Sequence, residues 1–303
     1  MHMYGSHLSI AGGLHNALIE ARSLKMDCVQ VFTKNQRQWT VPPLDEDQVN
    51  QWQQQRRETG IDTVVSHGSY LINLASPANP NRLKSLALFR EELRRCETLN
   101  IPWLVTHPGS HLNEGGTTGG LKRVVKALDQ LHRDLPGLTV RTCLEVTAGQ
   151  GTNLGSRFEE LQVVMNAVRA PERLAVCLDT AHMLAAGYDL SSAAGAEATL
   201  SELDHILGLE SVTVLHVNDS KTVRGSRVDR HAHIGQGHVA REAFAVLLGH
   251  PRFKTVPKIL ETPKGDDSKG RPWDRANLAR LQRIAKAPGR KYHSSQREGR
   301  RPT

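Results

Sequence analysis

Short segments rich in Val, Ile, Leu and Thr recur eight times along the chain, and longer stretches with helical periodicity separate them. Strand alternating with helix eight times within about 265 residues favours a single-domain, closed (β/α)8 TIM barrel, and an open doubly wound sheet is the alternative. The expected strands are 3–9, 28–33, 63–67, 103–107, 140–145, 174–179, 212–217 and 257–261. Helices are expected at 80–99, 121–133, 157–168 and 196–207, and the glycine-rich run 115–120 is expected to be a flexible loop.

The positive charge of the chain is concentrated at its C-terminus. The formal net charge is +8, and residues 286–303 hold +5 of it. The body is therefore only mildly basic, so charge alone is weak evidence for a nucleic-acid partner. We expect residues 1–285 to form the barrel domain and 286–303 a basic, disordered tail. The tail either adds an attraction to phosphate or is a solvated terminus without a role.

Cysteine usage and hydropathy bear on the compartment. The four cysteines form no C-x-x-C pair and are too few for a disulfide framework, which favours a reducing environment. No apolar run approaches the roughly 18 residues needed to span a bilayer, and the N-terminus has no signal-peptide pattern. We therefore expect a cytoplasmic protein with no membrane partner.

Histidines and carboxylates stand at the ends of the last six predicted strands. Because the C-terminal ends of barrel strands converge on one mouth, these side chains are expected to come within metal-ligand reach of one another. Local spacing adds three more, since His182 follows Asp179 by three residues and two further donors flank Arg230. The nine predicted metal ligands are His67, His107, Glu145, Asp179, His182, His216, Asp229, His231 and Glu261.

All nine residues offer nitrogen or oxygen, and none offers sulfur. Zn²⁺ accepts imidazole and carboxylate in open catalytic sites, and Mn²⁺ or Fe²⁺ also fits this donor set. With three to four ligands per ion, nine ligands serve two or three ions. A single histidine at a strand end is usually a hydrogen-bonded rim residue, but packing does not explain six ionisable groups in register, because a buried unpaired carboxylate is costly. Cys143 and Cys177 are expected to be apolar core residues below the site.

Longer motifs surround these residues. They are GSHLS (5–9), FTKNQRQW (32–39), HGSYLINL (67–74), HPG (107–109), LEVTAGQG (144–151), DTAHMLAAGYD (179–189), HVNDSK (216–221), GSRVDRHAHIG (225–235) and LETP (260–263). On these motifs, the chain from about residue 3 to residue 285 resembles the endonuclease IV family of apurinic/apyrimidinic (AP) endonucleases.

The resemblance implies three zinc ions per chain. It implies Glu145 as a bridge between the first two ions, with His67 and His107 on the first. Asp179, His216 and Glu261 would complete the second ion, and His182, Asp229 and His231 would hold the third.

The same resemblance implies a hydrolase of base excision repair. It would cut the backbone of damaged double-stranded DNA 5′ to abasic sites, leaving a 3′-hydroxyl and a 5′-deoxyribose phosphate, and would remove 3′ blocking groups. Glu145 and Glu261 are the candidate catalytic carboxylates. No nucleotide cofactor is expected, and we expect a monomer associated with the nucleoid through DNA.

Four further residues are candidates for DNA binding. Tyr70 and Leu71 follow His67 closely, and an apolar or aromatic wedge at a base step would unstack it, at least cost where a base is missing. Arg37 would fill the vacated space or hold phosphate, and Arg230 would contact the backbone. The alternative for Tyr70 and Leu71 is ordinary packing at a helix cap. For His7, at the end of the first strand, contact with the metal shell is a hypothesis.

Two rival functions remain open on the sequence. A metal-dependent sugar isomerase or epimerase uses the same kind of barrel mouth, typically with one or two ions. The third set of donors disfavours it. A non-catalytic DNA-binding protein stabilised by metal is the other rival, and incision of an abasic duplex would exclude it.

Overall fold

The barrel strands bury almost every side chain, because helices cover their outer face and packed side chains fill the interior. The computed structural model describes residues 2–286. The barrel strands are β1 (Met3–His7), β2 (Cys28–Val31), β3 (Thr63–His67), β4 (Trp103–Thr106), β5 (Arg141–Glu145), β6 (Leu174–Asp179), β7 (Val212–His216) and β10 (Pro257–Leu260). They are parallel and close in the order β1-β10-β7-β6-β5-β4-β3-β2, so the predicted closed barrel is confirmed and the open sheet is wrong.

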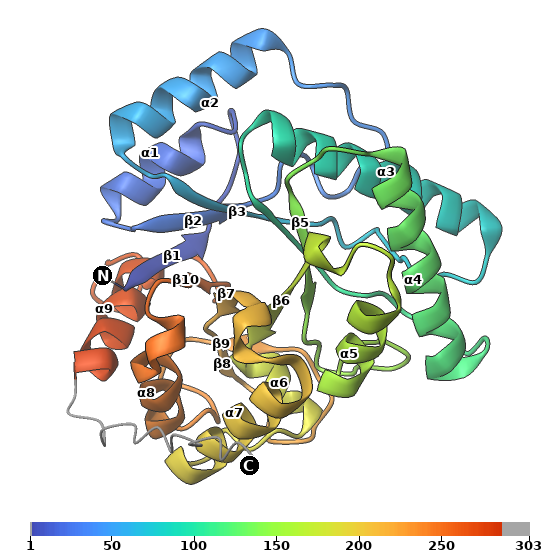
Figure 1. The fold of residues 1–303 in the computed structure, drawn as a ribbon. Coiled ribbons are helices and arrows are strands. Elements are labelled where there is room, and N and C mark those ends of the chain that lie inside the picture. The colour runs from blue at the N-terminus through green and yellow to red at the C-terminus, as the bar shows by residue number, and fades with distance from the viewer. Residues whose placement is uncertain (1, 287–303) are drawn as a thin grey trace, which may run out of the picture.

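Helices surround the strands (Figure 1). In the described residues these are α1 (Asn16–Ser23), α2 (Glu46–Thr59), α3 (Asn79–Thr98), α4 (Gly116–Asp134), α5 (Phe158–Ala167), α6 (Thr180–Ala186), α7 (Ala193–Leu207), α8 (Arg241–Gly249) and α9 (Trp273–Lys286), with single 3-10 turns η1 (Pro171–Arg173), η2 (Leu209–Ser211) and η3 (Pro251–Phe253). Helix α4 shows why they pack on the barrel. Its Leu121, Val124, Leu128 and Leu131 are buried along one face at helical spacing.

The predicted flexible loop at 115–120 is wrong, because α4 begins at Gly116. Gly115 and Gly116 both have positive φ, so they form the turn that starts the helix. Gly120 lies within the helix, where an added Cβ would come 2.8 Å from Leu154 and 3.0 Å from His111. The glycines therefore serve helix entry and close packing.

Below the mouth, the barrel interior is an apolar layer. It consists of Cys28, Val65, Val105, Cys143, Ala175, Cys177, Val214 and Ile259, all fully buried. Several of these stand two residues before a predicted ligand and face the same side of their strand. Cys143 and Cys177 are thus core residues with free thiols, as expected.

A short antiparallel pair, β8 (Asp219–Ser220) and β9 (His231–Ala232), follows β7 in the chain. Asp219 anchors the segment that follows it. Its fully buried carboxylate accepts the backbone N–H groups of Gly235, Gly237 and Val239 at 2.9 Å each. This anchoring fixes residues 235–239, the segment that follows β9, to the first residue of β8.

Within residues 2–286 no helix has both the length and the apolar character that crossing a membrane requires. The predicted tail falls almost wholly outside the described residues. Its first residue, Lys286, is the last residue of α9.

Candidate metal centre

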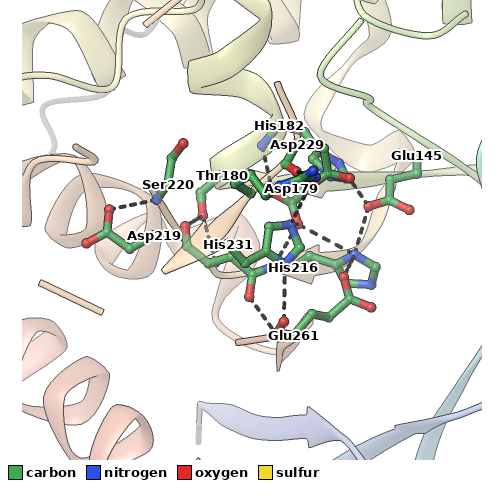
Figure 2. A network of polar contacts seen from close by, with 12 residues as sticks. Glu145, Asp179, Thr180, His182, His216, Asp219, Ser220, Asp229, His231 and Glu261 are labelled. Carbon is green, nitrogen blue, oxygen red and sulfur yellow. Dashed lines mark hydrogen bonds and ion pairs between the residues drawn. The ribbon is translucent and has the colours of Figure 1, made fainter. Parts of the chain in front are cut away.

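The predicted ligands gather at the C-terminal mouth of the barrel. His67, Glu145 and His216 are the last residues of β3, β5 and β7. Asp179, the last residue of β6, lies beside His216 in the parallel register. His107 and Glu261 directly follow β4 and β10. Topology alone therefore brings these side chains to one place, and Figure 2 shows Glu145, His216 and Glu261 turned toward one another.

Glu145 lies at the centre of the cluster and is fully buried. Its Oε2 is 3.2 Å from His67 Nε2 and 3.1 Å from His107 Nε2. Its Oε1 is 2.9 Å from His216 Nδ1 and 3.3 Å from His182 Nδ1. Burial alone would raise the pKa of this carboxyl, but the adjoining imidazoles, His216 and His107 foremost, hold the pKa well below its usual range. The distances show that each Glu145 oxygen faces a different pair of imidazoles.

A second group combines Glu145 with Asp179, His216 and Glu261, whose ligand atoms lie within 4.8 Å of one another. His216 Nδ1 is 3.2 Å from Glu261 Oε2 and 3.9 Å from Asp179 Oδ2. Burial lowers the pKa of His216, but the carboxylates of Glu261 and Glu145 outweigh it and raise the pKa to about 9. Three carboxylates therefore converge on one imidazole nitrogen.

The third group lies toward β8 and β9. Asp179, His182 and His231 offer ligand atoms within 4.8 Å of one another. The two oxygens of Asp229 lie 3.1 Å from His182 Nε2 and 3.3 Å from His231 Nε2. The predicted spacing around Arg230 thus places Asp229 and His231 on one side of the loop. Asp179 has two roles here, because its Oδ1 also accepts the His182 backbone N–H and caps α6.

The third group fits a cation better than it fits hydrogen bonding. His182 Nε2 and His231 Nε2 are buried atoms without a hydrogen-bond partner in the described part of the chain, although one carboxylate faces both. A buried polar atom without a partner costs about 1–3 kcal/mol. A metal ion between them would satisfy both nitrogens. The structure therefore holds several buried His/Glu/Asp clusters of a kind that fits a multinuclear metal centre.

Sequence reasoning missed two amides at this mouth. Gln30 of β2 is fully buried and donates from Nε2 to Glu261 Oε1 at 2.7 Å. Asn218 donates from Nδ2 to Asp179 Oδ2 at 2.7 Å and accepts the Glu261 backbone N–H at 2.7 Å. The available signal was a Gln between two Val residues of a strand that is otherwise apolar at that point. His7 also reaches Glu261, with Nδ1 at 3.3 Å from Oε1.

The candidate DNA-binding residues lie on the rim. Tyr70 is 68 % exposed, and its ring stands 5.6 Å from the His67 ring. It borders two hollows, one of about 220 Å³ that includes His107 and one of about 760 Å³ that includes Arg37 and Leu71. Leu71 is partly buried and packs against the core, in a turn that precedes α3. Arg230 is exposed beside the third group.

A buried ionic pair supports the rim from below. Glu92 of α3 accepts the Ser69 backbone N–H at 3.2 Å, and its Oε1 lies 3.7 Å from Lys34 Nζ. Ser69 Oγ in turn donates to the Gln36 carbonyl at 2.9 Å. Burial raises the pKa of Glu92 to about 7, and Lys34 opposes that shift. The loops that carry Arg37 and Tyr70 are therefore fixed to each other and to one helix.

Comparison with known proteins gives close relatives along nearly the whole chain. Residues 18–285 match the family described as Xylose isomerase-like TIM barrel. A protein of Chloroflexus aggregans named "Probable endonuclease 4" is 46 % identical over 286 residues, which cover 94 % of this chain and 99 % of that protein. The crystal structure of endonuclease IV from Thermus thermophilus is 36 % identical with a TM-score of 0.80, covering 93 % of this chain and 98 % of that one.

A more distant likeness concerns the fold alone. The crystal structure of a D-tagatose 3-epimerase-like protein has a TM-score of 0.70 but is only 16 % identical, over 93 % of this chain and 96 % of that chain. The barrel is thus shared with proteins whose names denote sugar chemistry, and the fold cannot decide between the two kinds of reaction.

Proposed function

Because this chain belongs to the endonuclease IV family, we propose that it hydrolyses the backbone of duplex DNA 5′ to abasic sites in base excision repair. The products would be a 3′-hydroxyl and a 5′-deoxyribose phosphate, and the same site would remove blocking groups from 3′ ends. The observation that supports this proposal is the position of Glu145, whose two oxygens lie within 3.3 Å of four imidazoles at the mouth.

We propose three zinc ions per chain, held by the nine predicted ligands. His67, His107 and Glu145 would hold the first ion, and Glu145 would share the second with Asp179, His216 and Glu261; the third would lie among His182, Asp229 and His231, with Asp179 within reach. Phosphodiester hydrolysis has two obstacles: water is a weak nucleophile, and the phosphate is anionic. Bound zinc would lower the pKa of water towards about 7 and would neutralise the charge of the phosphate.

The two candidate catalytic carboxylates have different tasks. Glu145 is fully buried and in contact with imidazoles on both sides, so it holds the donors in place. The Glu261 side chain is 13 % exposed, so it can reach solvent and the substrate phosphate. Burial would raise the pKa of Glu261, but the nearby imidazoles, His216 foremost, hold the pKa well below its usual range. Glu261 is therefore ionised at neutral pH, the form that would hold a cation.

Lesion recognition would fall to the rim. Tyr70, with Leu71 behind it, would enter the base stack where the missing base lowers the cost of opening. Arg37, on the loop after β2, and Arg230, between β8 and β9, are both exposed and would hold the DNA backbone near the lesion. We propose that residues 1–285 act as one domain and as a monomer on the DNA of the cytoplasm, and we assign no role to the tail.

The sugar isomerase or epimerase alternative receives support only from the fold. The third donor group and the exposed Tyr70 and Arg37 fit a large anionic polymer better than a small neutral sugar. Neither feature is needed to move protons on a ketose.

The deciding experiment is incision of a duplex that contains one tetrahydrofuran abasic analogue, with zinc-loaded protein before and after stringent chelation. We expect one cut 5′ to the analogue, its loss on chelation and its return with added zinc. Glu261→Gln is the control for a contaminating nuclease, because it should abolish cutting while the protein stays folded. Robust cutting by the metal-stripped protein would refute the proposal, and binding without cutting by the zinc-loaded protein would favour the non-catalytic rival.

A further inference from the structure

Strand β2 contributes no predicted metal ligand, but its Gln30 reaches the centre of the mouth. The residue is fully buried and faces the barrel interior, two positions beyond Cys28 of the apolar layer. Its carboxamide contacts three histidine or carboxylate groups from three other strand ends. Nε2 lies 2.7 Å from Glu261 Oε1 and 2.9 Å from His7 Nδ1, and Oε1 lies 2.8 Å from His216 Nε2.

The chemistry of these contacts allows one orientation of the amide. An ionised carboxylate only accepts hydrogen bonds, so the NH₂ end of Gln30 faces Glu261, and its oxygen faces His216. The reverse orientation would place two acceptor oxygens 2.7 Å apart in a buried site. Since the amide oxygen only accepts, His216 Nε2 must carry a proton.

That proton determines which nitrogen of His216 remains for a metal. With Nε2 donating to Gln30, the ring presents Nδ1 to the carboxylates, 2.9 Å from Glu145 Oε1 and 3.2 Å from Glu261 Oε2. A hydrogen bond to the far ring nitrogen is the usual way proteins fix the tautomer and direction of a metal-binding histidine.

We propose that Gln30 is a positioning residue of the second metal group: one amide selects the His216 tautomer that leaves Nδ1 free and orients Glu261 toward the same point. The inference rests on the metal centre proposed above. It adds a single side chain that controls two ligands from β7 and β10 at once. The second N–H of the amide is directed to His7 Nδ1, which links β1 to the same arrangement.

The test is the zinc affinity of Gln30→Leu, which replaces the amide by an apolar side chain of similar size. We expect zinc at the second group to be released at a chelator concentration about ten- to hundredfold lower than in wild type, the usual cost of losing such a partner. Zinc per chain is measured by atomic emission after equilibration with graded dipicolinate. Cys28→Ala is the matched control, because it lies on the same face of β2 without touching a ligand, and it should release zinc like wild type.

A second measurement needs no variant. In the zinc-loaded wild type, long-range ¹H–¹⁵N NMR correlations should show the His216 proton on Nε2. A proton on Nδ1 would overturn the inference, even if Gln30→Leu failed to fold. Wild-type zinc release by a folded Gln30→Leu would overturn it as well. If the inference about Gln30 fails but the wild type binds zinc and cuts abasic DNA, the proposed function still stands. If the wild type neither binds zinc nor cuts abasic DNA, the proposed function itself is refuted.

Discussion

Strand β10 has an ionisable side chain near each end, and the two find their partners in different ways. Near its start, Lys258 is fully buried, and its Nζ donates to the carbonyl oxygens of Phe253 at 2.5 Å and Val256 at 2.7 Å. Just past its end, Glu261 contacts the side chains of Gln30 and His216 in a cluster of other ionisable groups. The Lys258 ammonium therefore finds its hydrogen-bond acceptors in the backbone next to it, whereas Glu261 depends on side chains from other strands.

The difference separates a structural charge from a functional one. The Lys258 ammonium has three hydrogens and three carbonyls within reach, the third on Lys254 at 3.4 Å, so nothing further is required. At the mouth, buried nitrogens of His182 and His231 have no hydrogen-bond partner in the described residues. Buried polar groups are normally paired, so an unpaired set at a barrel mouth points to a ligand, while the paired lysine does not.

The largest effect is expected from Glu145→Gln. The change removes the charge that faces four imidazoles, so the zinc content should drop and kcat for incision of an abasic duplex should fall roughly a thousandfold or more. Lys258→Met, at the opposite end of the barrel, is the matched control and should keep kcat within about twofold. Similar losses of kcat in the two folded variants would contradict the distinction between the two ends.

Metal removal should lower the stability of the folded protein, and by the same amount whether or not Lys258 is present. Ligand at about a thousand times its dissociation constant stabilises the folded state by about 4 kcal/mol, so chelation should lower the melting temperature by roughly 10 °C, and added zinc should restore it. Calorimetry of wild type and Lys258→Met should give the same shift. No shift in wild type would argue that the mouth is complete without a cation.

Lys258 should make the free energy of unfolding depend on pH. Burial lowers the pKa of Lys258 from 10.5 to about 8. Between these values the unfolded chain binds the proton and the folded protein does not, so the free energy of unfolding rises with pH across this window, by up to roughly 3 kcal/mol. Below about pH 8 both states are protonated, and the full penalty of burying the charge applies.

Urea unfolding of wild type and Lys258→Met at several pH values measures this effect as a difference, which removes the titration of other groups. The stability of wild type relative to the variant should increase from about pH 8 to 10.5. A constant difference would mean that the three carbonyls keep the ammonium charged throughout.

A smaller effect is expected at the rim above the mouth. Tyr70→Ala should raise KM for an abasic duplex about tenfold with a lesser change in kcat, because stacking on a base contributes about 1–3 kcal/mol. Tyr70→Phe keeps the ring and should behave like wild type in steady-state incision. A loss confined to kcat in Tyr70→Ala would instead assign the ring to the reaction step.

Patterns confined to short segments predicted most of the fold. The eight strands lie where the apolar runs predicted them, with small errors at their ends: the first was expected to reach Ser9 and ends at His7. The family and the barrel predicted from the sequence are confirmed. The start of α4 was missed because glycine content indicates a loop locally, whereas Gly120 is required by its contact with Leu154.

The candidate site divides in the same way. Six of its nine predicted donors could be found because each ends a predicted strand, and parallel strands bring their ends together whatever else the chain does. His182 was found because it follows Asp179 by three residues, and Asp229 and His231 were found because they flank Arg230. The roles of Gln30 and Glu92 could not be found. Gln30 donates to Glu261, 231 residues away in the sequence, and Glu92 of α3 accepts a hydrogen bond from Ser69 in the loop after β3.

The sequence by itself therefore determined the barrel and the family and predicted the nine donors, because strand periodicity and the alternation of strands with helices are local patterns that add up to one closed topology. Only the tertiary structure decided how the donors face one another: which ring nitrogen of His216 meets the carboxylates, how Asp219 anchors the segment that follows β9, and which charges are complete without a ligand. Those choices depend on distances of about 3 Å between distant segments, and hydrogen bonds are decided at that scale.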